Sequence, residues 1–106
     1  MPFATHIEIL VPGDPEVARS FAMQVVDNAR FGVTNIADFR NATEESATAF
    51  VHELCDCRGV GKLAPGSILF RAVGTLKPAL EKAVAATPEK HHPWFSNAFR
   101  FCRDAE

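Results

Sequence analysis

The sequence predicts an α/β domain made of two β-α-β units, in which one sheet of four or five strands carries its helices on one face. Near the amino end, apolar residues alternate with polar ones, as they do in a half-buried strand. Directly afterwards, apolar residues recur at helical spacing. A later segment, ILFRAVGTLKPALEKAVAA, repeats the order of strand, glycine turn and helix found in EILVPGDPEVARSFAMQVV. This internal echo predicts one β-α-β unit in each half of the chain.

The size and charge of the chain restrict the class of protein. Its 106 residues, 47% of them hydrophobic and 23% charged, are typical of a single globular domain over residues 1–106. The net charge of −2 and the scattered basic residues argue against a nucleic-acid partner. No apolar stretch is long enough to span a membrane, so we expect no membrane partner. The odd cysteine count and the lack of a signal-like segment predict reduced thiols and a cytoplasmic location.

The first half of the chain carries clear signals for a strand, a helix and a second strand. The alternation predicts a strand over 3–11. Its expected buried side holds Phe3, Thr5, Ile7, Ile9 and Val11. Asp14 is a good helix cap and Pro15 suits the first helical position, which predicts a helix over 15–30. A weaker strand follows over 33–40.

The second half begins with an ambiguous segment, 43–57. Apolar residues at helical spacing and a possible Thr43 cap favour a helix, although TAFVHEL is rich in strand-forming residues. The segment SILFRAV then predicts a strand over 67–73, and Thr75 can cap the helix that follows it. Alternating phenylalanines predict a last strand near 95–103.

The opening segment MPFATHIEILVPGDPEVARSFAMQVV resembles the start of tautomerase-superfamily proteins of the 4-oxalocrotonate tautomerase type. Those proteins begin Met-Pro, run into a strand of alternating apolar residues and enter a long helix, within β-α-β units. TAFVHEL is also similar to the 5-carboxymethyl-2-hydroxymuconate isomerase branch. The resemblance covers about the first 30 residues. It implies a tautomerase or isomerase that acts on a small keto or enol acid.

The same resemblance implies two site residues. Once Met1 is removed, Pro2 becomes a secondary amine, and an apolar pocket would lower its pKa from the usual value of about 7.7–8.0 so that it acts as a base. Arg40, by its place after the second strand, would hold the substrate carboxylate. If Met1 is retained, the Pro2 nitrogen is an amide and cannot act as a base.

A second hypothesis is a non-catalytic, homo-oligomeric α/β module that binds an unknown ligand or partner. Phe95, Phe99 and Phe101 would need cover if the last strand lies at a sheet edge, and a dimer or trimer would supply it. A small carboxylate substrate is expected under the tautomerase hypothesis, whereas this second hypothesis leaves the ligand open.

The cysteines and histidines give a weak metal pattern. His52, Cys55 and Cys57 are potential zinc ligands, and on a helix His52 and Cys55 would share a face while Cys57 points away. Their spacing lacks the paired Cys-x-x-Cys arrangement of strong structural sites. We therefore predict no metal site, and the sequence gives no reason to expect another cofactor.

Overall fold

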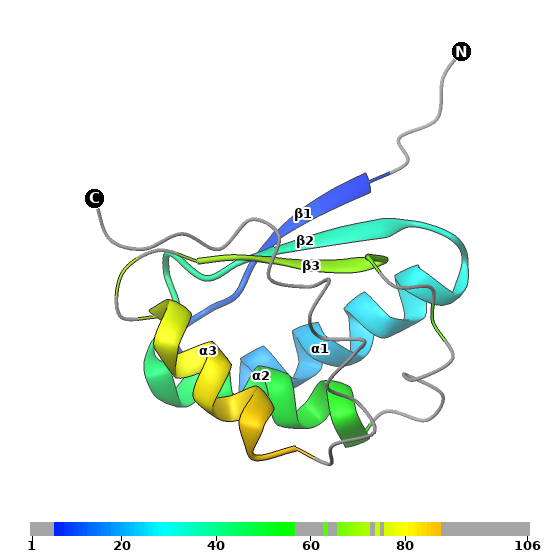
Figure 1. The fold of residues 1–106 in the computed structure, drawn as a ribbon. Helices are drawn as coiled ribbons and strands as arrows, with labels where there is room; N and C mark the ends of the chain where they lie inside the picture. The colour runs from blue at the N-terminus through cyan, green and yellow to red at the C-terminus, as the bar shows by residue number, and fades with distance from the viewer. Residues whose placement is uncertain (1–5, 57–62, 64–65, 73, 75, 88–106) are drawn as a thin grey trace.

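Strands and helices alternate along the chain in the computed structural model, which describes residues 6–56, 63, 66–72, 74 and 76–87. The elements are β1 (His6–Leu10), α1 (Pro15–Arg30), β2 (Thr34–Asp38), α2 (Glu44–Asp56), β3 (Ile68–Arg71) and α3 (Leu76–Ala85). The strands form a parallel sheet in the order β1-β2-β3. Figure 1 shows the three helices on one face of this sheet. The expected combination of helices with a sheet in a small domain is therefore confirmed.

The described residues form part of the expected sheet. The described sheet has three strands rather than four or five, and the predicted strand 95–103 lies outside the described residues. Parallel neighbours need a crossover, and α2 supplies one between β2 and β3. The described units β1-α1-β2 and β2-α2-β3 therefore share β2. The first is the unit expected in the first half of the chain, and the unit expected in the second half includes the strand 95–103 and stays a prediction. Crossovers of the same hand in this strand order place their helices on the same face.

The ambiguous segment is a helix because its first turn is well capped. The Thr43 hydroxyl oxygen accepts a hydrogen bond from the Ser46 main-chain N–H at 3.0 Å, and the Ser46 hydroxyl oxygen accepts one from the Thr43 N–H at 2.9 Å. This reciprocal pair satisfies donors that a helix end leaves open. The Thr43 hydroxyl also donates to the Gly13 carbonyl at 3.2 Å, which joins the loop before α2 to the loop before α1. The helix prediction is confirmed over the strand alternative.

Helix α1 begins where the sequence predicts. The Asp14 carboxylate accepts hydrogen bonds from the N–H groups of Glu16 at 2.8 Å and Val17 at 3.2 Å, and Pro15 occupies the first turn. The helix ends before Gly32, whose φ of 86° is accessible to glycine at little cost. The predicted bounds of 15–30 are those of the structure.

Three phenylalanine rings join the sheet to α2. Phe39 lies directly after β2, Phe50 on α2 and Phe70 on β3, and all three are fully buried. Their centroids are 5.4, 5.4 and 6.2 Å apart, and each pair meets edge to face. Such pairs stabilise a core beyond the area they bury. This cluster fixes α2 against the two strands beside it.

The predicted buried side of β1 is only partly correct. Val11 is fully buried and Ile9 packs partly buried against the core, but Ile7 is 40% exposed. In the described sheet β1 is an edge strand with a neighbour on one side only, so its first residues remain in contact with water. Phe3 and Thr5 lie outside the described residues.

Candidate functional site

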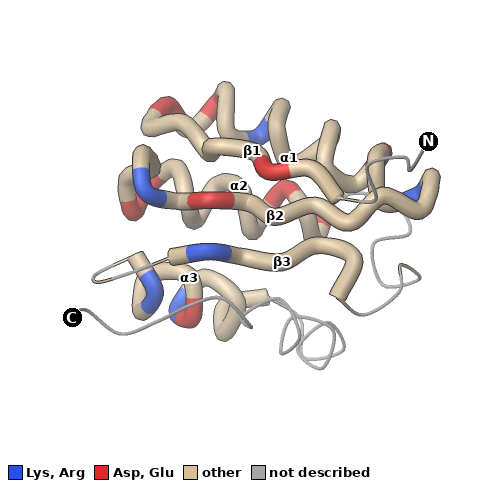
Figure 2. Tube along the Cα trace, turned by 90° about the horizontal axis from the view of Figure 1, so that it is seen from above, with Lys and Arg blue, Asp and Glu red and all other residues tan. Residues whose placement is uncertain are grey.

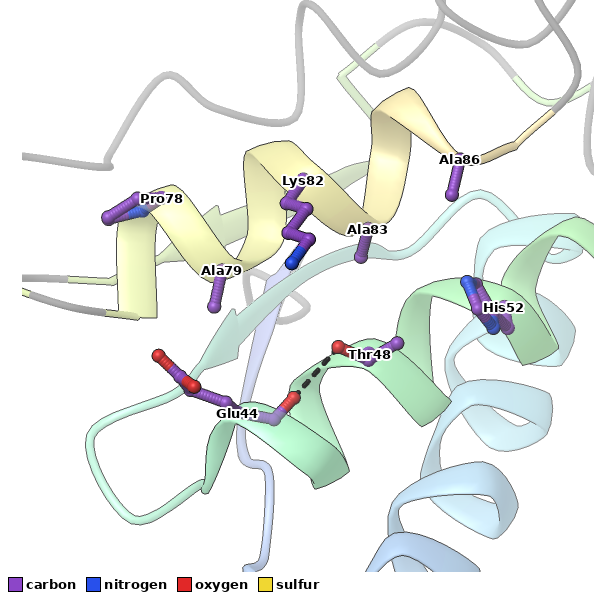
Figure 3. Close-up of a pocket in the computed structure, with 8 residues that line it drawn as sticks. All are labelled: Glu44, Thr48, His52, Pro78, Ala79, Lys82, Ala83 and Ala86. Atoms are coloured by element: carbon purple, nitrogen blue, oxygen red, sulfur yellow. Dashed lines mark hydrogen bonds between the residues drawn. The ribbon is translucent and has the colours of Figure 1, made fainter.

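A groove of about 540 Å³ runs between α2 and α3 (Figure 3). Its volume lies within the range of small-molecule sites. The lining residues are Glu44, Thr48, His52, Pro78, Ala79, Lys82, Ala83 and Ala86. Because both helices follow parallel strands, their amino ends lie at the carboxyl edge of the sheet, and the groove extends from there along the helix layer.

Small side chains on α3 create the space in this groove. Ala79 and Ala83 lie four residues apart and therefore share one face of α3, and Ala86 follows directly after the helix ends. Ala83 is almost fully buried, and Ala79 is half-buried. A methyl group extends less far from the helix than a leucine side chain would. The space between the two helices therefore stays open above these alanines, and their methyl groups form an apolar floor.

Polar groups stand over this floor from both helices. Glu44, Thr48 and His52 lie at successive turns of α2, and Lys82 extends from α3 with its ammonium directed toward α2 (Figure 3). The Thr48 hydroxyl donates to the Glu44 main-chain carbonyl at 2.8 Å, so its oxygen keeps its capacity to accept. The groove combines an apolar surface with a carboxylate, a hydroxyl, an imidazole and a cation. That combination suits a ligand with an apolar body and an acidic group.

A smaller groove of about 390 Å³ lies on the other side of α2, between α1 and α2. Glu44, Thr48 and His52 line both grooves, so these three side chains form a ridge between them. The α1 side contributes Arg19, which forms an ion pair with Glu16. The α2–α3 groove is the larger of the two, and its cation, Lys82, reaches across the apolar floor.

A second polar region crosses the sheet face that points away from the helices. Acidic and basic positions lie side by side across all three strands when the sheet is viewed from that side (Figure 2). The Arg71 guanidinium contacts the Glu8 carboxylate at 2.5 Å and the Asp38 carboxylate at 3.7 Å. Arg40 lies 3.8 Å from the same Asp38 carboxylate, and its main-chain N–H donates to Asp38 Oδ1 at 3.0 Å. These four residues form the charge ladder of the sheet.

The structure locates one of the two predicted site residues. The Arg40 side chain is 70% exposed and follows β2 at the carboxyl edge of the sheet, where ligands of open α/β sheets commonly bind. Pro2 lies outside the described residues. His6 is level with Thr34 in the register of the sheet. Arg40 follows Thr34 by six residues, so it lies about 20 Å along the strand direction from the level of His6. The joint role of Pro2 and Arg40 stays a prediction.

The residues considered as metal ligands occupy different surroundings. His52 is exposed and lines the groove, whereas Cys55 packs half-buried against the core, and Cys57 lies outside the described residues. Within the part of the chain that the structure describes, no three His, Cys, Asp or Glu side chains gather as a metal site requires.

The groove itself was not predicted from the sequence. Its signals are the alanine repeat of α3 and the spacing of Glu44, Thr48 and His52 on α2. Neither signal says that the two helices are neighbours.

None of the described helices has the length and apolar character needed to cross a membrane. No protein-family model, protein of curated function or solved structure matches this chain.

Proposed function

We propose that the protein is a binding module for a small organic acid with an apolar body, which it holds in the α2–α3 groove. The observation that carries this proposal is the alanine floor with Lys82 directed across it. The cysteine content of the sequence adds the expectation that the module works in the cytoplasm.

The arrangement of charges supports one orientation of the ligand. The Lys82 ammonium would donate a charge-assisted hydrogen bond to the ligand carboxylate. Glu44 lines the groove at the amino end of α2 and would repel that carboxylate, so the acidic group belongs on the His52 side of Lys82. The apolar body would then lie over Ala79 and Ala83, where each square ångström removed from water contributes about 25 cal/mol.

This proposal is tested with 3-phenylpropionate as the probe and 3-phenylpropanol as its uncharged counterpart, by NMR titration of the ¹⁵N-labelled protein. We expect millimolar binding of the acid, with shifts confined to the amides of α2 and α3. The Lys82→Gln variant should weaken binding several-fold, and Ala79→Phe, which fills the groove, should abolish it. Arg30→Gln removes an exposed cation at the end of α1 and serves as the matched control.

Two results would contradict the binding proposal. One is equal affinity for the acid and the alcohol, since Lys82 would then play no part. The other is a set of shifts spread outside α2 and α3, which would place the probe elsewhere on the protein. The spectra of the variants without ligand are compared with that of the wild type, and a close match shows that each variant is folded.

A second candidate function is a tautomerase-like enzyme with Pro2 as the base and Arg40 as the carboxylate anchor. It is favoured by the exposure of Arg40 at the carboxyl edge of the sheet. In this reaction the Pro2 amine would take the proton of the enol hydroxyl, and the ammonium so formed would return a proton to the far carbon of the enol double bond, which converts the enol into the ketone. Arg40 would hold the acid by forked hydrogen bonds.

Intact mass and a rate measurement test the enzymatic candidate separately. Retention of Met1 would exclude it, because the Pro2 nitrogen would then be an amide. With Met1 removed, ketonisation of phenylenolpyruvate should fall at least tenfold in Pro2→Ala and in Arg40→Gln. Lys82→Gln should leave that rate unchanged. Equal rates in all variants would leave only the binding module.

A further inference from the structure

We propose that a second copy of this chain extends the sheet at the outer edge of β1, antiparallel to it, with a two-fold axis passing beside Ile7. In the described part of the molecule β1 pairs with β2 and has no strand on its other side. Two large apolar side chains of this short strand, Ile7 and Leu10, are 40% and 42% exposed. An uncovered edge strand of this kind is a template for another strand.

The main chain of β1 is oriented for such pairing. The Val11 N–H donates to the Asp38 carbonyl at 2.9 Å, so the main-chain groups of Val11 point toward β2. Since this direction alternates along a strand, those of Ile7 and Ile9 also point toward β2. The N–H and C=O groups of His6 and Glu8 therefore point outward, where a second strand would meet them.

The charges on β1 favour the register centred on Ile7 over the one centred on Glu8. In an antiparallel two-fold pair, opposite residues carry their side chains on the same face of the sheet. Centring the axis on Glu8 would place the two Glu8 carboxylates opposite each other, which is unfavourable. Centring it on Ile7 places each Glu8 opposite His6 of the second copy, so that a carboxylate faces an imidazole twice. Both side chains are exposed on the sheet face away from the helices.

The same register matches the apolar side of the strand. Ile7 would meet Ile7 of the second copy as a pair without mutual main-chain hydrogen bonds, the type in which side chains lie closest. A two-fold axis perpendicular to the sheet keeps both helix layers on one side. The described strands would then form one continuous six-stranded sheet. The α2–α3 groove lies in the helix layer away from β1, so the interface does not depend on the proposed binding function.

Cysteine cross-linking tests the register directly. Antiparallel residues on the axis have Cα atoms about 4.5 Å apart, within the range that a disulfide accepts. The Ile7→Cys variant, oxidised with diamide, should therefore give a covalent dimer whose disulfide joins the two copies of position 7. Each copy of position 9 lies two residues beyond the axis in opposite directions, which separates them by about 13 Å. The Ile9→Cys variant is thus the matched control and should not cross-link.

A charge change tests the interface without new thiols. His6→Glu places two carboxylates opposite each other and should raise the dimer dissociation constant at least fivefold in sedimentation equilibrium. Met23→Glu adds the same charge at an exposed position of α1 and should leave the dissociation constant unchanged.

Several outcomes would overturn this interface. A wild-type protein that stays monomeric at about 1 mM excludes it. Cross-linking of Ile9→Cys as readily as Ile7→Cys, or of neither variant, excludes the register. If the protein is a monomer and the outward amides of His6 and Glu8 are still protected from exchange, another segment of the same chain pairs with the outer edge of β1. The predicted strand 95–103 would be such a segment. Circular dichroism of each variant confirms that it is folded.

Discussion

The two faces of the sheet carry different kinds of side chain. On the face toward the helices, Ala37, Phe39 and Phe70 are fully buried and belong to the apolar core. On the opposite face, Ile36 and Leu69 are neighbours in the register and are also buried, but Asp38 and Arg71 follow them as the next cross-strand pair. On the helix-facing side, close packing and burial of apolar side chains stabilise the fold. The other side adds paired charges, whose net contribution to stability is ordinarily small.

The strongest test of this comparison removes one ring from the helix-facing side. Phe39→Ala should lower the free energy of unfolding by about 3–5 kcal/mol, because it leaves a cavity between Phe50 and Phe70. Urea unfolding followed by circular dichroism measures the loss. Phe31→Ala truncates the same side chain at a position that is 87% exposed, and should cost little. A Phe39→Ala loss of less than about 1 kcal/mol would mean that the ring cluster does not hold the core together.

A smaller effect is expected from the polar side chain on the helix-facing side. Asn35 is fully buried, and its amide donates to the carbonyls of Val25 at 3.3 Å and Val33 at 3.1 Å. Its side-chain oxygen accepts from Asn28 at 3.2 Å, which ties the end of α1 to β2. Asn35→Ala should therefore cost about 1–3 kcal/mol, since these buried groups lose their partner.

The Asn35 prediction has a matched control in Asn41→Ala. Asn41 is exposed in the loop after β2, so its truncation should change the urea midpoint very little. Amide exchange gives a second measurement, because Asn35→Ala should speed exchange at the carboxyl end of α1 first. Equal costs for the two asparagine variants would show that the buried amide network contributes no stability.

Local signals in the sequence predicted the elements well. The bounds of α1 follow from a capping Asp14, a proline in the first turn and Gly32 beyond the end, and all three act within a few residues of the helix. The choice of helix for α2 also rested on a local signal, the Thr43 cap, although its reciprocal partner Ser46 became visible only in the structure. The weak strand predicted over 33–40 corresponds to β2, in which four consecutive residues are buried.

Arrangement in space was beyond the reach of these local patterns. The overlap of two crossover units at β2 depends on strand order, which no spacing of residues specifies. The groove needs α2 and α3 to be neighbours. The charge ladder needs Asp38 and Arg71 to be level in the register, with Glu8 two residues away from that level on β1. Arg40 was identified from its place after a strand, but its contact with Asp38 appears only in the folded chain.

The smallest predicted effect concerns the charge ladder. The Arg71 and Glu8 side chains are 41% and 55% exposed, so water weakens their attraction and the pair must also lose side-chain freedom. A double-mutant cycle with Glu8→Gln and Arg71→Gln should give a coupling of about 0.2–1 kcal/mol. In 1 M salt, where the screening length is about 3 Å, the coupling should fall toward zero. The exposed pair Arg30–Asp27 on α1 provides a comparison of similar exposure. A coupling above about 2 kcal/mol that salt does not reduce would show that both faces of the sheet stabilise the fold, and would break the comparison between them.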